Sequence, residues 1–228
     1  MASINEPLRP IRSFVRREGR ITGAQKEALE TLQSAYGIDA SRTIGKAYPF
    51  SHDTRIHLEI GFGDGETLIA LAKACPEDGF IGIDPHRPGA GRLLLRLKQE
   101  QIDNVRVIVG DAAEQLPALI EPDSLSRVLI LFPDPWPKKR HQKRRLVNTA
   151  FLRMLSEKIK RDGVLHLATD WLEYAEQMLE TLSEIRAFEN LDASGRYSPR
   201  PDWRPETKYE RRGLRLGHDV FDISLVRK

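Results

Sequence analysis

The sequence predicts one α/β domain with extensions, in which helices cover both faces of a mostly parallel β-sheet. Three observations lead to this prediction. From residue 55 onward, short β-type runs alternate with stretches of helical spacing. Four of these runs end at an aspartate. The chain has 228 residues, 40% of them hydrophobic, which is enough for one sizeable core.

Three short strands make up the first half of the predicted sheet. Residues 56–60 form a β-type run that ends in a glycine turn, and residues 67–74 then have helical spacing. Residues 80–83 form the second strand, residues 89–101 a helix, and residues 105–109 the third strand. The second and third strands each lead into an aspartate, which in a parallel sheet brings both carboxylates to the same edge.

The second half continues the alternation. Residues 127–132 form a fourth strand, and residues 145–160 have helical spacing. Residues 164–168 form a fifth strand, and residues 172–185 a helix. The last two predicted strands have no full helix between them and are 188–191 and 220–226. We therefore expect seven strands with an antiparallel strand at one edge, because antiparallel neighbours need no helical crossover.

The ends and composition of the chain exclude several classes. Residues 1–50 have the weakest strand pattern, and we interpret them as a basic, partly mobile arm, helical in part, before a main domain over residues 51–228. Cys75 is the single cysteine, which excludes an intrachain disulfide and a cysteine-based zinc cluster. The longest apolar runs are far below the ~20 residues of a membrane span. No signal-peptide pattern is present, so the expected location is the cytoplasm.

Charge is segregated along the chain, although the net charge is only +3. Residues 1–50 carry eight bases and five acids, and residues 196–215 carry seven bases and three acids. Residues 138–145 carry six bases and no acid. The rest of the chain is therefore acidic. Basic surfaces attached to an acidic body indicate a polyanionic partner such as a nucleic acid.

The first strand leads into a glycine-rich turn. Gly61, Gly63 and Gly65 follow at alternate positions, and glycine lets the backbone approach a ligand closely. The dinucleotide fingerprint needs its third glycine one place later, where this chain has Glu66. Asp84, at the end of the second strand, suits a ribose diol, because a carboxylate accepts two hydrogen bonds. Asp111, with the backbone of Ala112, suits the amino group of an adenine.

The most distinctive segment follows the fourth strand. Residues 133–137 contain three prolines, which fix the backbone and remove amide donors. Asp134 and Trp136 lie among these prolines, and six bases follow directly. A rigid loop with one acid and one aromatic ring suits recognition of a base beside a phosphate clamp.

These motifs closely resemble the bacterial tRNA (guanine-N7-)-methyltransferases. The resemblance rests on PDPWPKKRH at 133–141 with KRRL at 143–146, EIGFGDG at 59–65, ATDW at 168–171 and TKYE at 207–210. It extends from about residue 55 to the C-terminus, and the proline-rich segment is highly specific. It implies a Rossmann-like class I fold, S-adenosylmethionine as cofactor and a guanine of the tRNA variable loop as substrate. An acid two places before a G-x-G-x-G turn is typical of that class, which places Glu59 near the methionine end of the cofactor.

The resemblance and the strand-end pattern together give a set of candidate residues. The expected cofactor site comprises Glu59, Gly61, Gly63, Gly65, Asp84, Asp111, Ala112 and Asp134. The family assigns positions matching Asp134, Lys138, Asp170, Thr207, Lys208, Tyr209 and Glu210 to the active site or the tRNA. The expected phosphate contacts besides Lys138 are Lys139, Arg140, Lys143, Arg144 and Arg145. Two departures are Asp84-Pro85, where the family more often has Glu-Val, and Tyr209, which is often Phe.

The expected chemistry makes modest demands on the protein. Guanine N7 carries a lone pair and no proton, so attack on a sulfonium methyl group needs no general base. Alignment and electrostatics then supply most of the rate. Asp134 is the predicted catalytic residue, because its carboxylate can hold the guanine N1–H and amino group and opposes the developing positive charge. No metal is expected.

Three other interpretations remain open at this point. An enzyme that methylates an amino group carries Asn/Asp-Pro-Pro-aromatic at the same strand end, whereas this chain has Pro-Asp-Pro-Trp. A nicotinamide-dependent oxidoreductase needs the glycine spacing that is missing here. A non-catalytic RNA-binding module has no need for Glu59, Asp84 and Asp111. The sequence leaves open whether the protein is a monomer or a homodimer.

Overall fold

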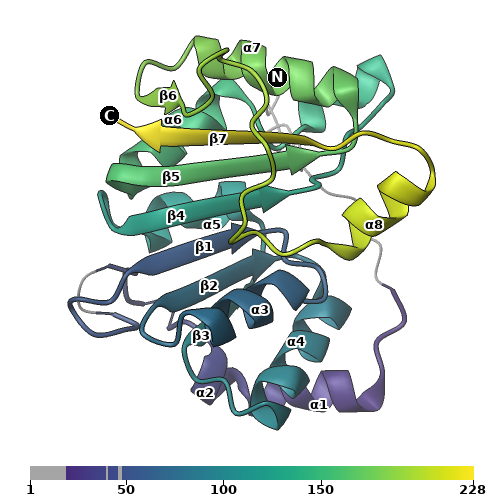
Figure 1. Ribbon diagram of the computed structural model, residues 1–228. Coiled ribbons are helices and arrows are strands. Elements are labelled where there is room, and N and C mark those ends of the chain that lie inside the picture. The colour runs from purple at the N-terminus through teal and green to yellow at the C-terminus, as the bar shows by residue number, and fades with distance from the viewer. Residues whose placement is uncertain (1–18, 40, 46–47) are drawn as a thin grey trace, which may run out of the picture.

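The computed structural model describes residues 19–39, 41–45 and 48–228, which form a seven-stranded sheet between two layers of helices (Figure 1). Residues 1–18 of the predicted arm lie outside the described residues. The strands are β1 Ile56–Ile60, β2 Gly79–Asp84, β3 Val105–Val109, β4 Leu125–Leu131, β5 Ile159–Thr169, β6 Phe188–Asn190 and β7 Phe221–Arg227. The helices are α1 Gly23–Thr31, α2 Gln33–Tyr36, α3 Glu66–Ala74, α4 Arg87–Gln99, α5 Ala112–Leu119, α6 Thr149–Lys158, α7 Leu172–Ser183, α8 Lys208–Arg215 and the short 3-10 helix η1 Lys139–Arg144.

The strand order is β3-β2-β1-β4-β5-β7-β6. The neighbours from β3 to β5 are parallel, and β7 is antiparallel to both β5 and β6. The predicted fold class is confirmed. The antiparallel strand lies second from the edge, since the three-residue β6 pairs on its outer side.

Each face of the sheet buries its own apolar cluster. Leu58 and Ile60 of β1 point to the face that α5, α6 and α7 cover. Phe80 of β2 and Leu129 of β4 point to the opposite face, where α3 and α4 pack. Because successive strand residues alternate between faces, His57 and Glu59 of β1 lie on this second face as well.

Only half of that second face is covered by helices. A coil over residues 196–207, which we call the strap, crosses in front of β7, β5 and β4 and then enters α8 (Figure 1). Trp203 of the strap lies 4.0 Å from the Arg127 guanidinium of β4 and edge-on to His166 of β5. The strap therefore brings residues near the C-terminus to the carboxyl ends of the parallel strands.

Local signals explain where the helices begin. Asn148 caps α6 by accepting from the Phe151 N–H, so this helix starts later than the predicted residue 145, and η1 precedes it. The helix α5 was not predicted, and Asp111 caps it. Thr207 and Glu210 form a capping box at α8, a pattern that is visible in the sequence but was assigned to substrate binding alone.

The helical part expected within residues 1–50 is present as α1 and α2. The helix α1 packs on α4, where Gly91 gives room for the backbone of Gln25. The division between an arm and a main domain at residue 50 stays a prediction. Among the described helices, none combines the length and the apolar character that crossing a membrane requires.

Candidate active site

The glycine turn after β1 has the backbone that its sequence predicts. Gly61, Gly63 and Gly65 have φ angles of +80°, +58° and +77°, which side-chain-bearing residues rarely adopt. Gly65 leads directly into α3. A Cβ at Gly61 would meet no atom within 4 Å, so space lies open above this turn.

Asp84 joins the turn to the end of β2. Its Oδ2 accepts the N–H of Gly63 at 2.8 Å, and its Oδ1 accepts the N–H of His86 at 2.7 Å. Burial raises the pKa of this carboxyl, against those two amide bonds. Each oxygen keeps a second lone pair for a hydroxyl donor. The departure at Asp84-Pro85 therefore leaves a carboxylate at the predicted strand end.

Glu59 lies at the floor of the site. Its carboxyl is buried, with the Thr67 hydroxyl and the Leu68 N–H as partners, and its Oε2 has no partner. Burial, helped by the nearby Asp84, raises its pKa to about 8. A buried carboxyl with an unsatisfied oxygen favours a cationic or hydrogen-bonding ligand beside it.

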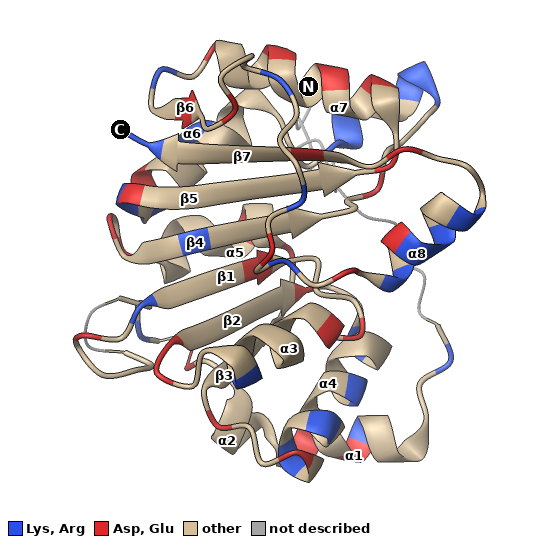
Figure 2. Cartoon of the chain, viewed as in Figure 1, with Lys and Arg blue, Asp and Glu red and all other residues tan. Residues whose placement is uncertain are grey.

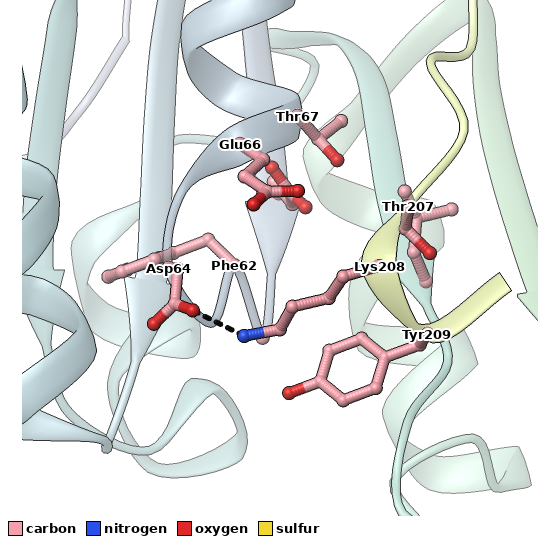
Figure 3. Close-up of a pocket in the computed structure, with 10 residues that line it drawn as sticks. Phe62, Asp64, Glu66, Thr67, Thr207, Lys208 and Tyr209 are labelled. Carbon is pink, nitrogen blue, oxygen red and sulfur yellow. Dashed lines mark hydrogen bonds and ion pairs between the residues drawn. The ribbon is translucent and has the colours of Figure 1, made fainter. Parts of the chain in front are cut away.

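A pocket forms where α8 meets the glycine turn (Figure 3). Lys208 extends across the pocket and forms an ion pair with Asp64 of the turn, while the ring of Tyr209 lies beside it (Figure 3). Asp64 also pairs with Arg92 of α4 at 2.7 Å. The lining residues are Glu59, Gly61, Phe62, Asp64, Glu66, Thr67, Leu131, Thr207, Lys208 and Tyr209.

Electrostatics matches this arrangement. Figure 2 shows acidic residues at the carboxyl ends of β1 and β2 and basic residues along α8. Burial acts to raise the pKa of Asp64, but Lys208 and Arg92 outweigh it and hold that pKa below its usual value. The helix α8 is therefore held beside the glycine turn by paired charges.

The proline-rich loop after β4 holds an unusual backbone. Phe132 and Trp136 have φ angles of +52° and +44°, which cost free energy in residues with side chains. The Trp136 ring lies edge-on to His141, with ring centroids 5.7 Å apart, and 5.0 Å from the Arg144 guanidinium. Asp134 is exposed, and its charge acts on Asp84. The loop therefore presents its acid outward at the same sheet edge.

The basic run after this loop divides into two kinds of residue. Five of its six cations are exposed or half-buried, namely Lys138, Lys139, Arg140, Lys143 and Arg144. Arg145 is the exception and corrects the sequence-based assignment. Its side chain is 4% exposed, and its Nε donates to the Pro135 carbonyl at 2.8 Å while Nη2 reaches Glu173. It holds the proline-rich loop from inside and is not placed to contact phosphate.

The remaining candidates lie around this edge. Asp111 is buried and accepts the Ala113 N–H at 2.8 Å as the cap of α5. Asp170, after β5, lies 3.5 Å from His218 and against Gly213 of α8. The pocket brings together Glu59 and Gly61 of the predicted cofactor group with Thr207, Lys208 and Tyr209 of the predicted substrate group. Asp84 does not line the pocket but is hydrogen-bonded to Gly63 of the same turn.

Asp64 and Thr67 also line the pocket but are not among the residues predicted from the sequence. Asp64 lies inside the glycine motif, where an acid between glycines was a usable signal, and Thr67 has no such signal. Within the described ranges, no three His, Cys, Asp or Glu side chains form a group that could hold a metal ion.

Comparison with solved structures identifies the fold. The chain aligns with the 16S rRNA methyltransferase KamB at a TM-score of 0.56 and 17% identity, covering 93% of this chain and 97% of that one. An rRNA methylase from Streptococcus thermophilus gives 0.51 and 13% identity, covering 92% of this chain and 99% of that one. At these identities the likeness shows the fold alone, which is the Rossmann-like fold of class I methyltransferases.

Sequence comparison is more specific. Residues 53–223 match the family described as "Putative methyltransferase". A tRNA (guanine-N(7)-)-methyltransferase from Nitrosococcus oceani is 51% identical, covering 96% of this chain and 92% of that one. Its namesake from Methylococcus capsulatus is 49% identical, with 96% and 94% covered. The chain therefore belongs to the tRNA (guanine-N(7)-)-methyltransferase family.

Proposed function

We propose that this protein transfers a methyl group from S-adenosylmethionine to N7 of a guanine in the variable loop of tRNA, giving 7-methylguanosine and S-adenosylhomocysteine. The observation that carries the proposal is the pocket between the glycine turn and α8, lined by Glu59, Lys208 and Tyr209 among others. Relatives of this chain at 49–51% identity bear the name of that activity. The expected compartment is the cytoplasm.

The residues present fit this cofactor. The open space above Gly61 and the unpartnered oxygen of Glu59 support a ligand that carries positive charge and lies against the turn. We assign Glu59 to the methionine end, Asp84 to the ribose, and Asp111 with Ala112 to the adenine. When bound, S-adenosylmethionine supplies a methyl group activated by a sulfonium. The protein's own contribution is to fix the geometry of the site and to exclude water from it.

We assign recognition of the guanine to the proline-rich loop and the start of α8. Asp134 is exposed at the sheet edge and can accept from the N1–H and amino group of a guanine. Its negative charge also opposes the positive charge that the purine gains. Asp170, Lys208 and Tyr209 complete the proposed substrate side, and Tyr209 is half-exposed, as a base-stacking residue must be.

The basic run supplies affinity in this proposal. Lys138, Lys139, Arg140, Lys143 and Arg144 are the proposed contacts to tRNA phosphates. Such contacts strengthen binding and make it more dependent on salt, but they discriminate little between sequences. Specificity then comes from tRNA shape and from the exposed base, which is turned out of the tRNA at a cost of a few kcal/mol.

The test is transfer of labelled methyl from S-adenosylmethionine to unmodified tRNA, followed by nucleoside analysis and mapping of the labelled position. We expect 7-methylguanosine in the variable loop. Label on an exocyclic nitrogen would favour an amino-methyltransferase instead. If no label transfers, measured binding of S-adenosylmethionine, a nicotinamide cofactor and tRNA separates an inactive enzyme from an oxidoreductase and from a non-catalytic RNA-binding module.

A further inference from the structure

A buried guanidinium ties the strap to the sheet. Arg204 is 2% exposed and lies between two carboxylates. It donates to Glu210 at 2.6 Å and 3.2 Å and to Oδ2 of Asp222 at 3.0 Å. Its Nε also lies 2.8 Å from Oδ1 of Asp222. One side chain thus joins α8 to β7.

The network continues into the sheet. Nε2 of His166, on β5, lies 2.8 Å from Oδ1 of Asp222, and Nδ1 lies 3.0 Å from the Ser224 hydroxyl. Trp203 covers His166 from the strap side, with ring centroids 5.2 Å apart. Buried ions are tolerated only when they are closely paired, so this geometry allows Arg204 little displacement.

The same contacts turn Glu210 away from the pocket. Its Oε1 accepts from Arg204 and Arg200, and its Oε2 accepts from Arg204 and from the Thr207 N–H. Glu210 is buried and does not line the pocket, whereas the two residues just before it do. The first turn of α8 therefore has two sides. Glu210 faces Arg204 and anchors the turn, while Lys208 and Tyr209 line the pocket.

We propose that Arg204 is a positioning residue for methyl transfer, because it holds the first turn of α8 against β7 and thereby places Lys208 and Tyr209 at the pocket. This role rests on the proposed function, since the reaction it serves is the one proposed above. Glu210 then acts through Arg204 and not by touching tRNA. Lysine cannot take over this role, because a point charge does not span two carboxylates as a planar guanidinium does.

The kinetic test compares Arg204→Lys and Glu210→Gln with the unaltered chain and with Lys73→Met. The control breaks a different ion pair, that of Lys73 with Glu100, outside the strap and α8. We expect kcat to fall about tenfold to a hundredfold in both strap variants, the cost of a small misplacement at an active site. The Kd for S-adenosylmethionine should stay within about twofold of the unaltered value, because Glu59, Asp84 and Asp111, which we propose to hold it, are untouched.

Amide hydrogen exchange gives a readout that needs no methyl transfer. In Arg204→Lys we expect amides of α8 to exchange at least about tenfold faster, while β1 and β2 keep their protection. Unchanged exchange in α8 together with unchanged kcat would overturn the proposal. So would equal acceleration in α8 and β1 in both strap variants, since that would give Arg204 a role in global stability only.

The second variant keeps the test decisive if Arg204→Lys does not fold. Glu210→Gln preserves side-chain size and the pairing of Arg204 with Asp222, and it must then show the same local loss of protection and the same fall in kcat. If the unaltered chain transferred no methyl group at all, the proposed function would be contradicted. The exchange comparison would still decide whether Arg204 anchors α8.

Discussion

The two halves of one sheet face bury charge in opposite ways. Under α3 and α4, the carboxyl of Glu59 has an oxygen without a partner, and its pKa is raised to about 8. Under the strap, burial acts on Asp222 in the same direction, but hydrogen bonds from His166 and Arg204 outweigh it and hold the pKa of Asp222 below its usual value. The helix-covered half thus contains a buried carboxyl with an unsatisfied oxygen, and the strap-covered half uses its carboxyl to attach the strap.

The difference also concerns what holds the covering segment. The helices α3 and α4 are held by apolar burial, which is non-directional and tolerates small shifts. The strap packs Trp203 on the sheet and is held in addition by short, directed contacts of the Arg204 guanidinium. A site between these halves has one wall that is held by apolar burial, on the side of α3 and α4. Its other wall, on the side of the strap, depends on directed hydrogen bonds and ion pairs.

The largest effect is expected from Glu59, whose Oε2 has no hydrogen-bond partner. Glu59 has a folded-state pKa above its unfolded one, so the folded state binds the extra proton, and this stabilisation is present below pH 4.5 and lost as the pH rises through about 8. We expect Glu59→Gln to gain about 4–5 kcal/mol in unfolding free energy over the unaltered protein between those limits, at 1.36 kcal/mol per pKa unit. Urea denaturation across this pH range measures it. A constant difference between the two proteins would contradict the raised pKa of Glu59.

Asp134→Ala is expected to lower the rate of methyl transfer without changing the stability of the fold. Asp134 is exposed, so the variant should unfold at the same urea concentration as the unaltered protein. Loss of its charge at the proposed guanine should lower kcat by about 10²–10³, comparable to removal of one group that stabilises a transition state. Single-turnover methyl transfer measures this. A folded, fully active variant would move the catalytic role to Asp170 or to positioning alone.

Leu68→Ala tests the helix-covered half. Leu68 is 1% exposed and packs on Gly82 of β2, so truncation should cost about 2–5 kcal/mol of unfolding free energy. Leu172→Ala, at a residue that is 51% exposed, is the matched control and should change stability by less than about 0.5 kcal/mol. Similar losses in both variants would mean that apolar burial does not hold this half.

The smallest expected effect is a difference between Arg144 and Arg145 in the salt dependence of tRNA binding. Arg144→Met should weaken tRNA binding and lower the slope of log affinity against log salt by about 1. Arg145→Met should leave that slope unchanged and lower stability instead. Methionine cannot donate to the Pro135 carbonyl or pair with Glu173, so both groups lose that partner. Binding titrations at several salt concentrations, with thermal unfolding alongside, measure both. An equal drop in slope for the two variants would return Arg145 to the phosphate contacts.

The helix-covered half could be predicted from the sequence. Its strands end at a glycine turn, at Asp84 and at Asp111, and these local signals need no knowledge of distant partners. The strap could not be predicted, because Arg204 pairs with Asp222, which in turn pairs with His166, and no periodic pattern in the sequence links these residues. Arg145 was misassigned for a related reason. A run of six cations gives no sign of which one turns inward.

The place of β7 in the sheet has a consequence for synthesis of the chain. Because β7 pairs with β5 on one side and β6 on the other, β6 cannot join the sheet before residues 221–227 leave the ribosome. Until then Asp222 is missing, Arg204 lacks one of its two anchors, and β5 presents an open edge. A nascent chain that has completed the glycine turn and the proline-rich loop therefore still lacks the anchored wall of its pocket.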